Sequence, residues 1–310
     1  MDTLSYDRGA LHPGAAHIGT GAFHRGHQQS YYDDLARSEA PGWSVRGINL
    51  APPDIAGAHR AQGGCYHLLT EDQHGRSLQK IGTLSAVDSA PDPLDPVWDG
   101  ISFVTLTITE KGYCHRPGST ALDLDGAVAA DLANPGRPQT APGYLCRMLE
   151  HRRQRGLGGL TLASCDNVAD NGALLRAVMR AYAAEVFPDL QGWMADHVSF
   201  PISMVDRIVP AMSPASAAGL QAAAGAADAL GVVAEPFRQW VLEDDFAGER
   251  PALEAVGVQI VPKVAVFEHM KHRLLNGLQS ALAELGRLAG HATSQEAKFL
   301  LLINSSSEAT

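Results

Sequence analysis

Apolar residues along this chain form short runs that alternate with stretches of helical periodicity. Four runs have the length and composition of buried strands, and they cover residues 15–21, 43–50, 101–109 and 160–164. The clearest is ISFVTLTIT at 101–109, because β-branched side chains favour strands. Three intervening segments have the spacing of amphipathic helices, at residues 27–37, 143–155 and 172–186. Strands separated by helices predict parallel βαβ units, and therefore an α/β fold with a doubly wound sheet.

Two further helices are predicted towards the C-terminus. Residues 213–230 are rich in alanine, although Gly219 and Gly225 interrupt them. From Phe267 onward, apolar residues follow a 3.6-residue period, and Gly290 is a plausible end. This stripe comprises Met270, Leu274, Leu275, Leu278, Ala281, Leu282, Leu285 and Leu288. After Ala297 the chain continues as a short apolar burst and a polar tail without helical periodicity.

Composition narrows the class of protein. With 45% apolar and 19% charged residues in 310, the chain has an ordinary globular balance. Its net charge of −10 argues against a protein that coats nucleic acid, because phosphate binding needs clustered Lys and Arg. No apolar run has the roughly 18 residues of a membrane span, and the first thirty residues contain no signal-peptide core. We therefore expect a cytoplasmic protein.

Metal chemistry finds little support in the spacing of cysteines and histidines. The four cysteines form no C-x-x-C pair, which disfavours a zinc ribbon or a thioredoxin-type site. The chain has 13 histidines, and His24 and His27 have a spacing that suggests a metal-dependent hydrolase. That alternative lacks an H-E-x-x-H motif and a third placed ligand, so no metal site is predicted.

The first candidate site is the glycine-rich turn HIGTGAFHRG at residues 17–26. Gly19 and Gly21 follow a predicted strand and precede a helical pattern, where glycine lets the backbone approach a pyrophosphate at a helix N-terminus. The third position of the G-x-G-x-x-G fingerprint is His24, so a tight turn without a ligand fits the spacing equally well. The candidate cofactor-binding residues are Ile18, Gly19, Thr20, Gly21, Ala22, Phe23, His24 and Arg25.

Asp54 is the candidate for the acidic residue that holds the adenosine ribose in dinucleotide folds. It follows the predicted strand at 43–50, and its charge would repel a 2′-phosphate and so favour NAD over NADP. Its distance from the glycines exceeds the usual spacing of roughly 20 residues. The alternative is that Asp54 caps a helix that starts after Pro52 and Pro53.

The long C-terminal helical pattern carries a polar face. Lys271, Asn276 and Gln279 fall at about 0°, 140° and 80° around a helix, so they share one broad face. A desolvated Lys with a lowered pKa can act as a general base, and an Asn can stabilise an alkoxide. The alternative is an ordinary solvated face.

Several blocks together resemble the polyol-specific long-chain dehydrogenases, the family of mannitol 2-dehydrogenase and fructuronate reductase. They are GTGAFHRGHQ at 19–28, LTITEKGYC at 106–114, SCDN at 164–167, SMVDRIVP at 203–210, EPFRQWVLEDDF at 235–246 and MKHRLLNG at 270–277. The resemblance implies a Rossmann-like NAD domain at residues 1–265, followed at 266–310 by the start of a mostly helical substrate domain. It also implies metal-free hydride transfer between NAD and a small sugar alcohol or sugar acid.

The resemblance assigns roles to individual residues. Lys271 matches the general base of the family motif K-x-x-x-x-N-x-x-H, and Asn276 and Asn167 match the pair that stabilises the alkoxide. Asp206 matches a family position near the site, or else forms a structural ion pair with a neighbour such as Arg207. Asp54 aligns with the ribose-binding carboxylate, although Pro53 replaces the acidic residue that can precede it.

Two departures from the family pattern qualify the functional prediction. Gln279 stands where the motif has His, and Gln cannot titrate or carry a charge. Family members also continue well beyond the Lys/Asn helix, so the resemblance implies a C-terminally truncated chain. The prediction is therefore an NAD-dependent polyol or hexonate dehydrogenase, with a truncated relative that binds NAD(H) with little or no turnover as the alternative.

Overall fold

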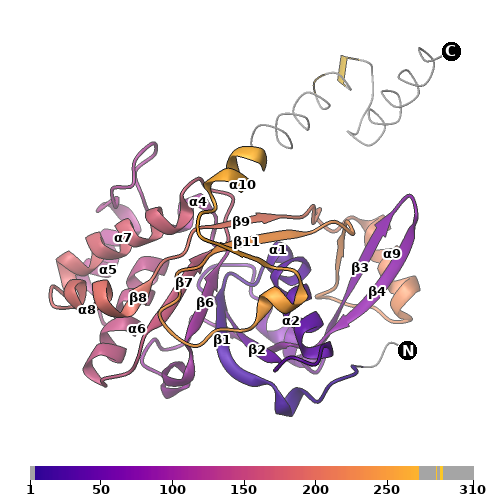
Figure 1. Ribbon diagram of the computed structural model, residues 1–310, viewed down its shortest axis with the longest axis horizontal. Coiled ribbons are helices and arrows are strands. Elements are labelled where there is room, and N and C mark those ends of the chain that lie inside the picture. The colour runs from indigo at the N-terminus through magenta and orange to yellow at the C-terminus, as the bar shows by residue number, and fades with distance from the viewer. Residues whose placement is uncertain (1–3, 272–283, 285–286, 289–310) are drawn as a thin grey trace. The chain divides into compact units, whose positions relative to one another are not determined.

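The computed structural model describes residues 4–271, 284 and 287–288 (Figure 1). The contacts divide the chain into two compact units, Met1–Pro262 and Lys263–Thr310. The first unit contains three sheets and nine α-helices among its described residues. Helix α10, Ala265–Met270, belongs to the second unit. None of the helices in the described part of the chain is long and apolar enough to cross a bilayer.

A six-stranded sheet forms the centre of the first unit, with the strand order β5-β2-β1-β6-β7-β8. Its strands are β1 His12–Ile18, β2 Trp43–Asn49, β5 Leu84–Ser89, β6 Phe103–Leu106, β7 Leu160–Ser164 and β8 Val198–Ser199. Every neighbouring pair is parallel. The chain builds outward from β1 on one side and then crosses to β6 to build the other side. This is the Rossmann strand order, which confirms the predicted doubly wound sheet and puts its switch point between β1 and β6.

Helices cover one face of this sheet and a mixture of helices and small sheets covers the other. Ala16 and Ile18 of β1 point into a core on the face that is covered by helices alone, and we call these helices the first group. Ala15 points into a second core on the opposite face, together with Tyr32 and Trp240. The alternation follows from the two-residue period of a strand. The first group comprises α5 Gly126–Ala133, α6 Ala141–Gln154, α7 Asn171–Val186 and α8 Leu190–His197 (Figure 1).

Two three-stranded sheets complete the first unit. One, in the order β10-β3-β4, combines β10 Val232–Ala234, β3 Tyr66–Asp72 and β4 Gly75–Ile81. The other, in the order β12-β11-β9, combines β12 Gln259–Val261, β11 Gln239–Glu243 and β9 Ser203–Asp206. The remaining α-helices are α1 Ala22–Gly26, α2 Gln28–Arg37, α3 Ala56–Ala61, α4 Thr109–Gly112 and α9 Pro214–Ala224. Short 3-10 turns lie at Arg8–Ala10, Pro96–Gly100 and Leu253–Val256.

The structure corrects some of the predicted boundaries. The helix expected at 27–37 is observed as α2, and a further short helix, α1, precedes it. The two helices are separate because His27 between them has the non-helical angles φ −112° and ψ −81°. The helix expected at 213–230 ends at Ala224, because Gly225 adopts φ +76° and stops it. The strand expected at 101–109 is shorter, since its polar end turns into α4. Most of the helix expected from Phe267 lies outside the described residues.

Candidate functional site

The turn after β1 depends on a glycine at residue 19. Gly19 has φ +95°, in the left-handed region that favours glycine, and its N–H donates to the carbonyl of Ile48 over 2.8 Å. A Cβ at this position would lie 2.1 Å from the carbonyl oxygen of Thr107, at the start of the connection after β6. Gly19 therefore brings the ends of β1 and β6 together at the switch point of the sheet.

Gly21 presents an open surface beside this contact. A Cβ built on Gly21 meets no atom within 4 Å, and Gly21 and Ala22 are exposed whereas Ile18 and Thr20 are buried. Helix α1 begins directly after Gly21, and no side chain caps its first N–H groups. The N–H of Gly21 itself donates to the carbonyl of Gly19 over 2.8 Å, so the open space lies on the Cα side of Gly21, next to the uncapped first turn of α1. An uncapped helix start with open space beside it fits an anionic pyrophosphate. The turn therefore fits the dinucleotide that its sequence predicts.

His24 and Arg25 shape the turn from inside. His24 is fully buried and stacks on His17 with 3.4 Å between the ring centroids. Burial lowers the pKa of His17 to about 3 and the pKa of His24 well below its usual value, so both rings are neutral. The Arg25 guanidinium donates to the carbonyls of Thr20 and Leu230. Residue 24 is therefore His where the G-x-G-x-x-G fingerprint has its third glycine, and the His24 side chain packs beneath the turn.

The contacts of His24 and His27 do not form a metal pair. Nε2 of His24 lies 3.0 Å from Nε2 of Gln29, whereas Nε2 of His27 lies 2.9 Å from the carbonyl oxygen of Gln239 on β11. Within the described part of the chain, no group of three or more His, Cys, Asp and Glu residues could hold a metal ion. The structure therefore offers the metal-hydrolase alternative no ligand set in that part.

Two side chains that the sequence reasoning missed hold the turn to its neighbouring strands. The side-chain oxygen of Asn49, the last residue of β2, accepts the N–H and the hydroxyl of Thr20 at 3.1 and 2.6 Å. Thr107 Oγ1 donates to the carbonyl of Gly19 over 2.7 Å and lies 2.8 Å from Nε2 of His17. Asn49 ends β2 and Thr107 directly follows β6. Polar residues near the carboxyl ends of the predicted strands are the signal that could have identified them.

Asp54 lies in the connection after β2, at the same edge of the sheet. Its Oδ1 accepts the Ser89 hydroxyl at the end of β5 and the N–H of Ala56 in the first turn of α3, at 2.6 and 2.9 Å. These two hydrogen bonds, the Ser89 bond first, hold the pKa of this exposed carboxyl below its usual range. Asp54 therefore holds the chain just before α3, whose N-cap is Ile55, and both hydrogen bonds end on one of its two carboxylate oxygens. Its ribose-binding role stays a prediction.

Asn167 follows β7, the next parallel strand beyond β6. It is exposed, and it directly follows Asp166, which accepts the N–H groups of Ile108 and Thr109. The predicted alkoxide ligand therefore lies in a loop attached to the connection after β6, the same connection that touches Gly19. The carboxyl edge of the sheet thus carries the glycine turn, Asp54 and Asn167.

The structure says less about the remaining predicted catalytic residues, Asp206, Lys271 and Asn276. Asp206 is half-buried and ends β9, where it pairs with Gln239 of β11. The adjacent Arg207 donates to the carbonyls of Gly26 and Glu235, and burial lowers its pKa to about 10. Lys271 directly follows α10 in the second unit, and Asn276 and Gln279 lie outside the described residues. Their roles stay predictions.

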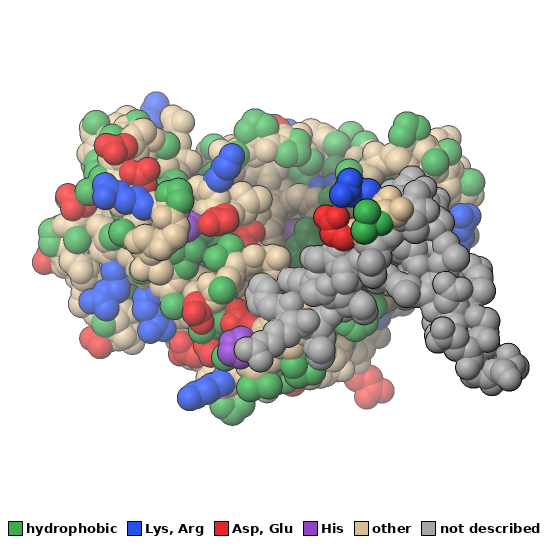
Figure 2. Space-filling view, turned by 90° about the horizontal axis from the view of Figure 1, so that it is seen from above, with side chains coloured by type: hydrophobic (Ala, Val, Ile, Leu, Met, Phe, Trp, Pro, Cys, Tyr) green, Lys and Arg blue, Asp and Glu red, His purple; other side chains and the backbone are tan. Residues whose placement is uncertain are grey.

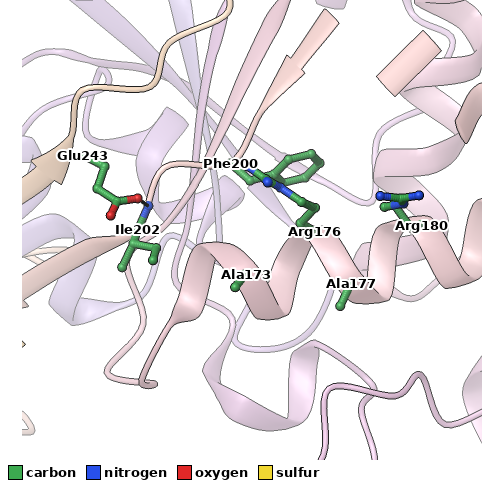
Figure 3. A pocket seen from close by; sticks show the side chains of 7 residues that line it. All are labelled: Ala173, Arg176, Ala177, Arg180, Phe200, Ile202 and Glu243. Atoms are coloured by element: carbon green, nitrogen blue, oxygen red, sulfur yellow. Dashed lines mark hydrogen bonds between the residues drawn. The ribbon is translucent and has the colours of Figure 1, made fainter. Parts of the chain in front are cut away.

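A cavity of about 350 Å³ lies beside α7, and none of the predicted site residues lines it (Figure 3). Its lining combines two arginines of α7 and one glutamate with small and apolar side chains, namely Ala173, Arg176, Ala177, Arg180, Phe200, Ile202 and Glu243. Figure 2 shows Lys and Arg interspersed with Asp and Glu on the visible face. That face offers no continuous basic stripe in the described part of the chain, in line with the acidic net charge.

Comparison with known proteins identifies relatives over most of this chain. The family model for the mannitol dehydrogenase Rossmann domain matches residues 13–255. The D-mannonate oxidoreductase of Escherichia coli is 37% identical over 299 residues, which cover 93% of this chain and 62% of that protein. A polyol:NADP oxidoreductase of Gluconobacter oxydans is 39% identical over 306 residues, which cover 94% of this chain and 62% of that protein.

A solved structure supports the same relationship. Mannitol 2-dehydrogenase of Pseudomonas fluorescens, in a ternary complex with NAD and D-mannitol, superimposes with a TM-score of 0.86 at 39% identity. The match covers 94% of this chain and 61% of that one. This chain thus spans about three fifths of the length of the relatives it matches. On the family model, the sequence identity and the shared fold, the chain belongs to the mannitol dehydrogenase family.

Proposed function

We propose that this chain forms the cofactor-binding part of an NAD-dependent oxidoreductase. The enzyme would transfer a hydride between the nicotinamide and the carbinol carbon of a sugar alcohol, a hexonate or a ketohexuronate. One observation carries the proposal: the backbone beside Gly21 is open at the switch point between β1 and β6, where doubly wound sheets bind dinucleotides. The names of the relatives, which act on mannonate and polyols, support the substrate class.

The residues of the turn would divide the work of holding NAD. The exposed backbone at Gly21 and Ala22 would face the pyrophosphate, and the buried Ile18, Thr20, His24 and Arg25 would fix the shape of the turn. Phe23 is half-buried and lies between these two groups. Asp54 would accept the ribose hydroxyls and repel a 2′-phosphate. We therefore propose NAD rather than NADP, in contrast to the relative from Gluconobacter oxydans, which is named for NADP.

The proton chemistry would belong to the polar side chains predicted from the sequence. When bound, NAD supplies the acceptor or donor of the hydride. Lys271 Nζ would take the proton of the reacting hydroxyl, or return it in the opposite direction. The side-chain amides of Asn276 and Asn167 would donate hydrogen bonds to the alkoxide oxygen, which carries the developing negative charge. Asp206 would lie near this site as a polar neighbour.

Two assays on the purified chain test the proposal. The first is a direct NADH-binding titration, and the second follows NADH oxidation with fructuronate, fructose and tagaturonate. Binding with turnover of one of these substrates is the expected result. Binding without turnover would instead support the alternative, a relative that binds NAD(H) without catalysis. Absence of binding would overturn the proposal.

A substitution tests the proposed base. Lys271→Ala should remove turnover while NADH affinity stays within about twofold, because the base acts on the substrate hydroxyl. Lys263→Ala is the matched control, since it removes the same charge from an exposed lysine of the same unit and should leave turnover unchanged. If Lys271→Ala retains activity, the assignment of the base is wrong.

A further inference from the structure

The Asp166 carboxylate connects two loops at the carboxyl edge of the sheet. Its Oδ2 accepts the N–H of Ile108 at 3.0 Å and the hydroxyl of Tyr113 at 2.7 Å. Its Oδ1 accepts the N–H of Thr109 at 2.9 Å. Burial is the largest influence on this group and raises the pKa of Asp166 above its usual value. All three of these hydrogen bonds therefore join Asp166 to the connection after β6.

The connection that Asp166 holds is under backbone strain. Thr109 has φ +63°, in the left-handed region, and a β-branched side chain makes that conformation unfavourable. The hydrogen bond from Thr109 N–H to Asp166 fixes this residue at the start of α4. Two residues earlier, Thr107 Oγ1 donates to the carbonyl of Gly19. The strained connection thus links the glycine turn on one side to Asp166 on the other.

The backbone of Asp166 is fixed as firmly as its side chain. Asn171 is fully buried, and its Nδ2 donates to the carbonyls of Asp166 and Ser203 at 3.0 and 2.8 Å. The N–H of Ser203 returns a hydrogen bond to Asn171 Oδ1 at 3.0 Å. Ser203 begins β9, the strand that ends at Asp206. The peptide that precedes Asn167 is therefore held at a set position relative to β6 and β9.

Tyr113 extends this arrangement into the core. It is fully buried, and its hydroxyl lies 2.5 Å from Ser164 Oγ at the end of β7 in addition to donating to Asp166. Hydrogen bonds to an ionised carboxylate are stronger than those between neutral groups. Tyr113 is therefore a rigid support that keeps the Asp166 carboxylate facing the connection after β6.

We propose that Asp166 is a positioning residue, which sets Asn167 relative to the glycine turn by clamping the strained connection at Ile108 and Thr109. Asp166 touches neither substrate nor cofactor in this role. It acts through Asn167, whose amide must reach the alkoxide, and through Thr107, which contacts Gly19. This inference rests on the proposed function, because positioning matters for catalysis only where Asn167 stabilises an alkoxide.

Asp166→Asn is the direct test, because Asn has the same shape but replaces one accepting oxygen with an N–H₂ group. That group would face N–H donors or the Tyr113 hydroxyl, so the clamp would loosen. We expect kcat to fall by about 100-fold, the loss that a misplacement of about 1 Å can cause, while the dissociation constant for NADH changes less than about threefold. Amide hydrogen exchange at Ile108 and Thr109 should accelerate by at least about tenfold.

Two further variants keep the test decisive. Tyr113→Phe removes one of the hydrogen bonds to Asp166 and should lower kcat by a smaller factor, so it still tests the clamp if Asp166→Asn does not fold. Asp170→Asn is the matched control, because Asp170 is an exposed carboxylate of the same loop whose left-handed φ of +50° asparagine tolerates. It should match the unmodified chain in exchange and in kcat.

The readouts separate the two proposals. If the unmodified chain binds NADH without turnover, the proposed function fails. The amide exchange rates and the fluorescence emission of bound NADH then still test whether the hydrogen bonds of Asp166 clamp the connection at Ile108 and Thr109. Faster exchange at Thr109 and an altered NADH emission in Asp166→Asn would support it. The positioning role of Asp166 would be overturned if Asp166→Asn left amide exchange unchanged, or left kcat unchanged in an active chain. An equal loss of kcat and NADH affinity in Asp166→Asn would also overturn it.

Discussion

Gly19 and Gly21 are two residues apart, and the structure predicts opposite consequences for an alanine at each. At Gly19 the new Cβ would lie 2.1 Å from the Thr107 carbonyl oxygen, well inside the 3.0 Å below which real Cβ contacts essentially never fall. The backbone would have to move by about 0.9 Å, the difference between these two distances. A left-handed conformation costs alanine about 1–2 kcal/mol, and the overlap costs about 1–3 kcal/mol more. Gly19→Ala should therefore lower the free energy of unfolding by about 2–5 kcal/mol.

At Gly21 the stability effect should be small and the binding effect large. Gly21 has φ −66°, which alanine adopts freely, and its Cβ would meet no protein atom within 4 Å. The free energy of unfolding should therefore stay within about 0.5 kcal/mol of the unmodified chain. The added methyl group would, however, occupy the space that the pyrophosphate needs for close approach. We expect NADH affinity to fall by about 10- to 100-fold, or about 1.4–2.8 kcal/mol of binding free energy.

Urea unfolding and a fluorescence titration with NADH measure the two effects separately. Gly192→Ala is the matched control, because Gly192 lies inside α8, where an added methyl group would meet no atom within 4 Å, and this substitution should leave NADH affinity unchanged. If Gly21→Ala binds NADH as tightly as the unmodified chain, the open backbone at this turn does not face the cofactor. If Gly19→Ala is as stable as the unmodified chain, the steric argument is wrong.

Two further predictions concern charge. Asp54→Asn keeps an oxygen that can accept from Ala56 and Ser89 but removes the charge, so the preference for NADH over NADPH should narrow in parallel titrations; an unchanged preference would contradict the ribose assignment. Acid should destabilise the first unit through its buried imidazoles. The pKa of His17 is about 3 in the folded chain against an ordinary 6.5, so the unfolded state binds more protons between these values and stability falls as pH drops below 6.5. At pH 5 this contribution is about 2 kcal/mol, and His24 acts in the same direction. Urea unfolding at pH 7.5 and 5.0 measures it, and His17→Gln should flatten the dependence; equal stability of the unmodified chain at both pH values would contradict it.

The sequence predicted those parts of the fold that depend on local pattern. The strands β1, β2, β6 and β7 and the helices α6 and α7 follow from apolar runs and helical spacing, and their alternation predicted the doubly wound sheet. The small sheets did not follow, because strands such as β9 and β11 are short and pair over long sequence distances. Gly225 shows the limit within a helix, since its positive φ ends α9 where composition alone favoured continuation.

Motif and structure contribute different parts of the candidate site. The G-x-G pattern located the turn, but the role of His24 depends on its stack with His17, a contact that no spacing rule contains. Asn49, Thr107 and Asp166 were missed because each acts by a hydrogen bond to another strand connection. Such contacts depend on the strand order, and they become predictable only once β1 is known to lie between β2 and β6.

The most direct test of this account is a titration of the purified chain with NADH, followed by the quenching of protein fluorescence, with NADPH titrated in parallel. A dinucleotide site at the switch point with Asp54 at its ribose end predicts saturable binding of one NADH per chain, and weaker binding of NADPH. A chain that is folded by circular dichroism but shows no saturable binding of either nucleotide would contradict the account.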